Sequence, residues 1–125
     1  MKYLQVIESA YRGSIEEQDD TIVWLSLAMK GAGADLDVLL RGNAVNYAHT
    51  GQDASGLKFG EWRQTQPPRI HEEVQKLIDK GAKVFAVRED LQKRGIASGL
   101  LPNIETIGER ELAGLYEQYE RVSYW

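Results

Sequence analysis

The sequence predicts an α/β fold of three layers, α/β/α, built on a mainly parallel sheet of about five strands. Two observations support this prediction. Short apolar runs without helical spacing recur along the chain, and stretches with apolar residues at helical spacing lie between them. Strands that alternate with helices form parallel sheets covered on both faces, and the chain length suits a single domain, residues 1–125. The predicted strands are residues 3–8, 36–40, 83–87, 104–107 and 121–125.

The first predicted helix follows the first strand. Ser14, with Glu17 three residues later, forms the pattern of a capping box, which marks a helix start. Acidic residues up to Asp20 then fall in the first turns, where the helix dipole favours negative charge. Gly31 or Gly33 is expected to end this helix. Helical spacing predicts a buried stripe of Ile15, Ile22, Leu25 and Met29.

Three further helical segments follow along the chain. Residues 44–49 are predicted to form a short helix after the second strand. Pro67 and Pro68 open the next helix, because proline suits the first helical positions, and Gly81 ends it. Asp90 is expected to cap a helical turn after the third strand. The predicted apolar stripes are Ile70, Val74, Leu77 and Ile78 on the second long helix, and Leu112, Leu115, Tyr116 and Tyr119 on a helix over 109–120.

The segment 50–66 has neither a helical nor a strand period, and it contains three glycines. A loop of this length in a small domain is functional, a packing arm, or disordered. Phe59 and Trp62 argue against plain disorder, because large apolar side chains need a surface to pack on.

Composition excludes several classes of protein. The net charge of −4 and the pI near 5.2 argue against nonspecific nucleic-acid binding. No apolar run approaches the ~20 residues of a membrane span, and the first residues do not form a signal peptide. We therefore expect a cytoplasmic protein that binds neither nucleic acid nor membranes. The chain has no cysteine, which excludes disulfides, thiolate metal sites and thiol nucleophiles.

Polar residues follow the predicted strands, where parallel sheets place their ligand sites. The Gly-Ala-Gly run at 31–33 is not a dinucleotide fingerprint, because it precedes a strand instead of opening a helix. Arg12 can assist backbone N–H groups in holding an anion, although ordinary helix capping is the simpler interpretation. Of the two histidines, His49 is the better candidate for acid–base chemistry and His71 is expected on a solvated turn. Two histidines without a cysteine predict no zinc site, and we expect no cofactor.

Three stretches, spread over nearly the whole chain, resemble a known family. They are LQVIESAYRGS (4–14), LDVLLRGNAVNYA (36–48) and VFAVREDLQKRGI (84–96). Together they resemble the DsrE/DsrF-like family of small sulfur-relay proteins. The resemblance implies a Rossmann/flavodoxin-like α/β/α fold and a homo-oligomer, which in this family is a dimer, trimer or hexamer. The terminal pair Tyr124-Trp125 independently suggests a contact between subunits at a sheet edge.

The resemblance also implies what this chain lacks. Family members that carry sulfur hold it as a persulfide on a cysteine at the end of the third strand. Matching Leu91, Arg94 and Gly95 to the family pattern places Val87 at or next to that position. Since valine has no nucleophilic atom, the resemblance implies a noncatalytic oligomeric binding or scaffold subunit linked to sulfur metabolism. A sulfur-pathway protein is then a candidate partner.

The expected site lies in the loops 9–13, 42–49 and 87–94. One alternative is a cysteine-independent small-ligand binder or enzyme that uses the polar residues of these loops, so enzymatic activity is left open. Another is a purely structural oligomer whose strand-end pocket is filled by residues 50–66. No catalytic residue and no metal ligand is assigned. The predicted ligand-binding residues are Ser9, Arg12, Asn43, His49, Val87, Arg88 and Arg94.

Overall fold

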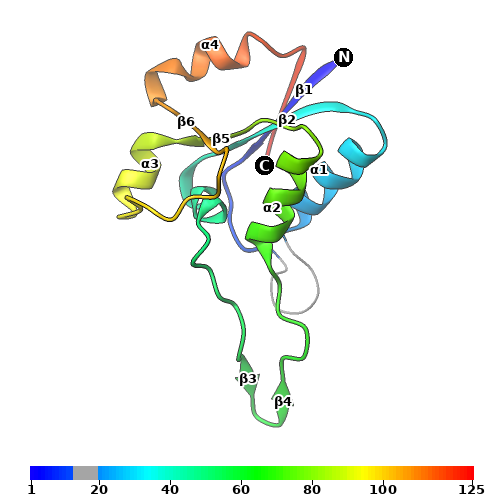
Figure 1. Ribbon diagram of the computed structural model, residues 1–125, viewed down its shortest axis with the longest axis vertical. Helices are drawn as coiled ribbons and strands as arrows, with labels where there is room; N and C mark the ends of the chain where they lie inside the picture. Colours follow the sequence, from blue (N-terminus) through cyan, green and yellow to red (C-terminus); the bar gives the residue numbers. More distant parts are fainter. Residues whose placement is uncertain (13–19) are drawn as a thin grey trace.

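The computed structural model describes residues 1–12 and 20–125 and contains a five-stranded parallel sheet (Figure 1). The strand order is β6-β5-β2-β1-β7, and every neighbouring pair is parallel. The predicted α/β fold is confirmed, and each predicted strand is present within one or two residues of its expected bounds. The strands are β1 Lys2–Ile7, β2 Asp35–Leu40, β5 Val84–Val87, β6 Glu105–Ile107 and β7 Arg121–Tyr124.

The first face of the sheet is covered by the longer helices. Helix α1 (Thr21–Gly31) and helix α2 (Ile70–Asp79) pack there side by side (Figure 1). The short helices η1 (Gly42–Ala48) and α3 (Arg88–Lys93) extend this cover beyond the strand ends. The core of the first face joins residues of all these elements, among them Val23, Leu40, Val45, Val74, Leu77, Val84 and Leu91.

The second face has a much smaller cover. It consists of the 3₁₀ turn η2 (Glu109–Glu111) and the five-residue helix α4 (Leu112–Tyr116). The predicted helix over 109–120 is therefore wrong in length. The chain leaves the helix after Tyr116 so that Tyr119 can turn back onto the sheet, where its hydroxyl donates to Asp37 Oδ2 at 2.6 Å. The core of this face is Leu4, Val6, Leu39, Phe85, Val87, Ile107, Leu112, Leu115 and Tyr119.

Helix α1 starts in a different way from the prediction. Asp20 is its N-cap and does not lie inside the helix: Oδ1 accepts from the backbone N–H groups of Ile22 at 2.9 Å and Val23 at 3.2 Å. The other oxygen, Oδ2, accepts from the Tyr47 hydroxyl at 2.7 Å, and both side chains are fully buried. Burial, followed by the bond to Asp20, raises the pKa of Tyr47.

The predicted Ser14–Glu17 capping box and Ile15 lie outside the described residues. Of the rest of the predicted stripe, Ile22 is buried, whereas Leu25 and Met29 are only half-buried. Val23 and Ser26 complete the buried side of the helix, which ends at Gly31 as expected.

The turn after β5 also differs from the prediction. Helix α3 begins directly at Arg88, so Asp90 lies within its first turn and is not its cap. The Asp90 carboxylate instead accepts from the backbone N–H of Gly42 at 2.8 Å. The Asp90 side chain, which local propensity favours as a helix cap, therefore forms a long-range hydrogen bond in place of a cap.

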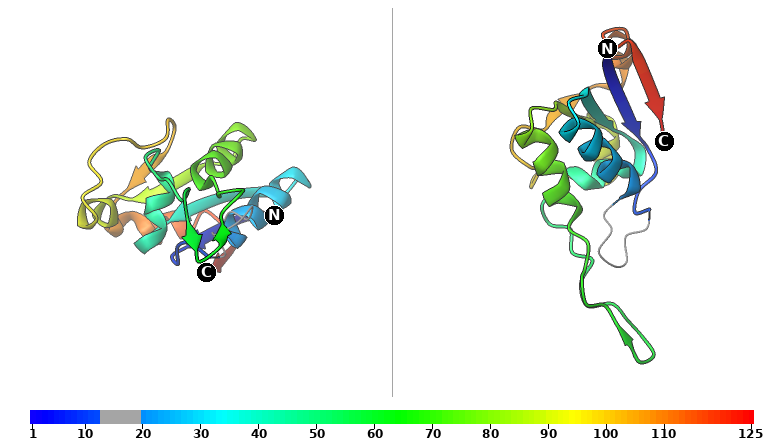
Figure 2. Two further views of the ribbon diagram at one scale, coloured as in Figure 1. Left: turned by 90° about the horizontal axis from the view of Figure 1, so that it is seen from below. Right: turned by 90° about the vertical axis from the view of Figure 1, so that its right-hand side faces the viewer.

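Residues 57–63 form an arm that projects from the rest of the molecule (Figures 1 and 2). Two short antiparallel strands, β3 (Lys58–Phe59) and β4 (Trp62–Arg63), pair around a turn in which Gly60 has a φ of 59°. This positive φ favours glycine at the tip. The arm points away from the sheet (Figure 1), whereas Gly51 and Gln52 at the start of the segment 50–66 line a pocket near the strand ends.

Candidate functional site

The carboxyl ends of all five strands meet at one edge of the sheet, where α/β proteins bind ligands. Two loops dominate this edge, because β2 and β5 are neighbours in the centre of the sheet. The loop after β2 is η1, and the loop after β5 is α3. We call this region the strand-end rim.

Val87 ends β5 at the rim and is 1% exposed. Its side chain packs within the core of the second face. The position that the resemblance gives to a sulfur-carrying cysteine is therefore occupied by a buried aliphatic group, which can neither attack nor bind sulfur covalently.

Two of the predicted site residues, Asn43 and Arg94, lie together in the structure. Arg94 donates to Asn43 Oδ1 from Nε at 3.2 Å and from Nη2 at 2.7 Å, and its Nη1 donates to the Asp90 carbonyl at 3.1 Å. The Asp90 carboxylate meanwhile holds the N–H of Gly42. These bonds join η1 to α3 and orient both loops, so much of the hydrogen-bonding capacity of Asn43 and Arg94 is used within the protein.

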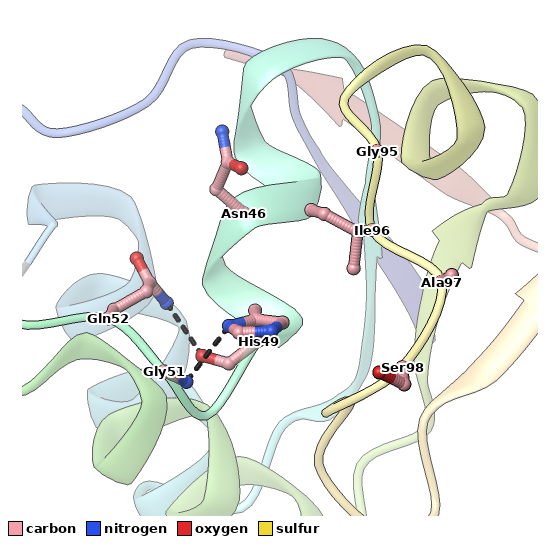
Figure 3. Close-up of a pocket in the computed structure, with 8 residues that line it drawn as sticks. All are labelled: Asn46, His49, Gly51, Gln52, Gly95, Ile96, Ala97 and Ser98. Atoms are coloured by element: carbon pink, nitrogen blue, oxygen red, sulfur yellow. Dashed lines mark hydrogen bonds between the residues drawn. The ribbon is translucent and has the colours of Figure 1, made fainter.

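His49 lines a pocket of about 250 Å³ between η1 and the loop after α3 (Figure 3). Its Nδ1 accepts from the backbone N–H of Gly51 at 2.9 Å, which leaves Nε2 to carry the proton of the neutral ring. Gly99, which is not among the lining residues, lies close to the imidazole: a Cβ added there, where φ is 78°, would lie 2.8 Å from His49 Nε2. Glycine at this position therefore leaves the room that the imidazole occupies.

The lining of the His49 pocket contains amide, hydroxyl and imidazole groups and no carboxylate. It therefore suits a small neutral or anionic ligand better than a cation. Within residues 1–12 and 20–125, no three His, Asp or Glu side chains gather as a potential metal site. The residues that line the pocket are Asn46, His49, Gly51, Gln52, Gly95, Ile96, Ala97 and Ser98.

The remaining predicted residues lie elsewhere on the rim. Ser9 is exposed, and its backbone N–H donates to the Trp125 carbonyl at 3.3 Å. Arg12 is half-buried in the loop after β1. Arg88 is exposed at the start of α3 and reaches toward Gly108, where an added Cβ would meet its Nη1 at 3.2 Å. These three side chains are not among those that line the His49 pocket in the described part of the chain.

Sequence reasoning missed a second polar group at the rim, centred on Arg41. Arg41 Nη1 donates to the Tyr116 hydroxyl at 3.2 Å, and its guanidinium lies 5.8 Å from the ring centroid of Tyr124. Burial acts to lower the pKa of Arg41, but the bond to Tyr116 and the nearby Tyr124 and Glu8 raise it overall. Arg41 Nε is buried and has no hydrogen-bond partner among the described residues.

Arg41 directly follows β2 at the rim, and Val87 ends the neighbouring strand β5. The Arg41 guanidinium contacts Tyr116 and also Tyr124 of β7, a strand that lies on the opposite side of β2 from β5. The Arg41 group is therefore a second polar cluster at the rim, directed toward β7.

The fold and the rim together define a small α/β protein with an open parallel sheet and polar groups at its strand carboxyl ends. No known family profile matches the chain, and no curated protein is similar in sequence. Several solved structures share the fold, including the following three. The chain is similar to the ychN protein of E. coli, with a TM-score of 0.74 and 22% identity over 99% of this chain and 98% of that one.

The other two structures are less similar. A conserved protein of unknown function from Bacteroides thetaiotaomicron, BT1422, has a TM-score of 0.65 and 13% identity, over 99% of this chain and 95% of that one. A protein of unknown function from Methanobacterium thermoautotrophicum, MTH1491, has a TM-score of 0.60 and 13% identity, over 99% and 98% of the two chains. The fold is consistent with the DsrE-like family that the sequence resembles. In the described residues, no helix has the length and apolar character needed to cross a bilayer.

Proposed function

We propose that this chain is a DsrE/DsrF-like protein that has lost sulfur transfer and acts as a noncatalytic, homo-oligomeric binding subunit. The observation that carries the proposal is Val87: a buried aliphatic side chain ends β5, and the chain has no cysteine to replace it. The proposal places the protein in the cytoplasm, with a sulfur-pathway protein as its partner.

The His49 pocket supports a more specific role in binding a small ligand. Its lining offers an imidazole N–H, two side-chain amides and no carboxylate, a combination that favours small anions. The bonds between Arg94, Asn43 and Asp90 hold the neighbouring loops in place, so the pocket is preformed. Preformed pockets bind with a lower entropic cost.

A thermal-shift measurement with thiosulfate as the probe tests this role. Ligand at 100 times its Kd stabilises a folded protein by about 2.7 kcal/mol. We expect wild type and His71→Ala to be stabilised alike, because His71 does not line this pocket. His49→Ala should lose the stabilisation. An equal shift in His49→Ala, or no shift in the wild type across a panel of small anions, would contradict the binding role.

A further inference from the structure

The tip of the arm exposes three large apolar side chains: Leu57 at 37%, Phe59 at 63% and Trp62 at 40%. We call them the arm tip. The rings of Phe59 and Trp62 stack on each other, with centroids 5.6 Å apart and an interplanar angle of 27°. None of the three belongs to either core of the sheet. A two-stranded hairpin alone is marginally stable in water, so a projecting arm with stacked aromatics is suited to contact another surface.

A second exposed apolar surface lies on β7. Val122 pairs with Leu4 and Tyr124 with Val6, and both partners face the second side of the sheet. Val122 is nevertheless 38% exposed and Tyr124 is 52% exposed, because α4 is too short to cover the edge strand. We call these two residues the β7 strip. The arm of the same chain extends away from the sheet (Figures 1 and 2).

The charges of the two surfaces are complementary. The arm carries Lys58 and Arg63 against a single acidic residue, Glu61. The segment 112–120, which leads from α4 into β7, carries two glutamates, Glu117 and Glu120, and no basic residue, and Arg121 begins β7 itself. Both glutamates are exposed. Complementary charge around an apolar centre favours association and sets its orientation.

From these observations we propose that the arm tip of one chain docks on the β7 strip of a second copy of the same chain. Phe59 and Trp62 then cover Val122 and Tyr124, and the basic residues of the arm face Glu117 and Glu120. Both halves of the interface are present on one chain, which is the argument for a second copy over an unrelated partner. The two halves are different patches, so the contact is heterologous and links chains head to tail.

This contact would complete the strand-end rim. Tyr124 lies against Arg41, which follows β2 at the rim. An arm seated on Tyr124 shields this group from solvent, so the partner copy contributes to the site. The inference rests on the homo-oligomer of the proposed function and names its interface.

Sedimentation velocity of the full chain and three variants tests the interface. The arm variant is Phe59→Ala with Trp62→Ala, and the strip variant is Val122→Glu. The control is Trp24→Ala, which removes an aromatic side chain that is 60% exposed on α1. We expect wild type and control to be oligomers, and the dissociation constant to rise at least ~30-fold in the other two, as for the loss of a hot spot. Far-UV circular dichroism checks that each variant folds, and Lys58→Glu with Arg63→Glu provides a second arm variant.

A mixture of the arm variant and the strip variant gives the decisive result. The strip variant keeps an intact arm and the arm variant keeps an intact strip, so an equimolar mixture should form heterodimers and nothing larger. A wild-type oligomer that survives in the arm variant, or a mixture that stays monomeric, overturns this interface while the proposed oligomer stands. A wild type that is monomeric at all concentrations overturns both, and the anion-binding role is then judged by the His49 experiment alone.

Discussion

The two faces of the sheet follow the same alternation of side chains but are covered very differently. The first face is packed by helices of 11 and 10 residues, and a continuous core runs from the sheet into η1 and α3. The second face is covered by a helix of five residues. Its core ends before β7, where Val122 and Tyr124 remain exposed, and Arg41 Nε remains without a partner among the described residues.

Among the described residues, each side of the sheet has a buried aspartate that is hydrogen-bonded to a tyrosine. On the first side, Asp20 binds Tyr47, and both are fully buried. On the second face, Asp37 binds Tyr119, which is 9% exposed. The first pair lies within the continuous core, and the second lies near the edge of an incomplete one. The difference indicates that the first face supplies most of the stability of the fold, while the second face is available for association.

The largest expected effect is at Asp20. Asp20→Ala removes the N-cap of α1 and leaves the Tyr47 hydroxyl buried without its acceptor. We expect a loss of about 3 kcal/mol in the free energy of unfolding, from about 1 for the cap and about 2 for the orphaned hydroxyl. Urea unfolding measures it. Tyr47→Phe in the same background should recover part of the loss, and a loss below about 1 kcal/mol would show that the first face does not depend on this pair.

A smaller loss is expected on the second face. Asp37→Ala removes the acceptor of the Tyr119 hydroxyl and of the Lys83 backbone N–H, at 2.6 and 2.8 Å. Water can replace part of these bonds near the edge, so we expect about 2 kcal/mol from the same urea experiment. Tyr119→Phe, which keeps the ring and leaves Asp37 bound to Lys83, is the milder control. A loss larger than that of Asp20→Ala would reverse the comparison of the two faces.

The stability of the protein at alkaline pH tests the two buried tyrosines, Tyr47 and Tyr119. Burial and the aspartate bonds raise the pKa of both Tyr47 and Tyr119 from the ordinary 10.0. Above that value the unfolded chain loses these protons while the folded chain keeps them, so folding stability falls as the pH rises. As the pH rises from about 9 to about 11, the unfolding midpoint should fall in the wild type. We expect a smaller fall in Tyr47→Phe. An unchanged pH dependence in both Tyr47→Phe and Tyr119→Phe would contradict these shifts.

The sequence was sufficient for the sheet, because apolar runs buried on both faces have no other regular solution in a small α/β chain. It was insufficient at the ends of helices, where long-range hydrogen bonds determine which residue acts as the cap. Asp90 was expected to cap α3 and instead binds Gly42, 48 positions away. Helix α1 is capped by Asp20, whose second carboxylate oxygen accepts a hydrogen bond from the Tyr47 hydroxyl. In both cases the hydrogen-bond partner is distant in sequence, so local propensity cannot predict the bond.

At the candidate site, too, some features follow from the sequence and others depend on long-range contacts. The structure brings Asn43 and Arg94 into contact, since the strands before them are adjacent and central. The Arg41 group was missed because it requires Tyr116 and Tyr124, which come from the far end of the chain. One signal was present: Arg41 directly follows the apolar run of the second predicted strand, where parallel sheets place their polar groups.

The smallest expected effect on stability is at Val87. The same variant tests how tightly the core of the second face is closed. Val87→Cys restores a thiol at the end of β5 with little change in volume, so we expect a change below about 1.5 kcal/mol. Val87 is 1% exposed in the core of the second face. A buried apolar thiol is inert. The new cysteine should therefore react with polysulfide far more slowly than a cysteine placed at the exposed Ser9, as measured by intact mass.

The reaction rate distinguishes a closed site from an intermittently open one. If Val87→Cys and Ser9→Cys acquire sulfur at similar rates, the incompletely covered second face opens near β5 and exposes the thiol at position 87 to the reagent. The rim would then retain the surroundings that sulfur transfer needs and would lack only the sulfur atom. If Val87→Cys stays unmodified until the protein is unfolded, the loss of sulfur chemistry extends beyond one residue to the packing around it.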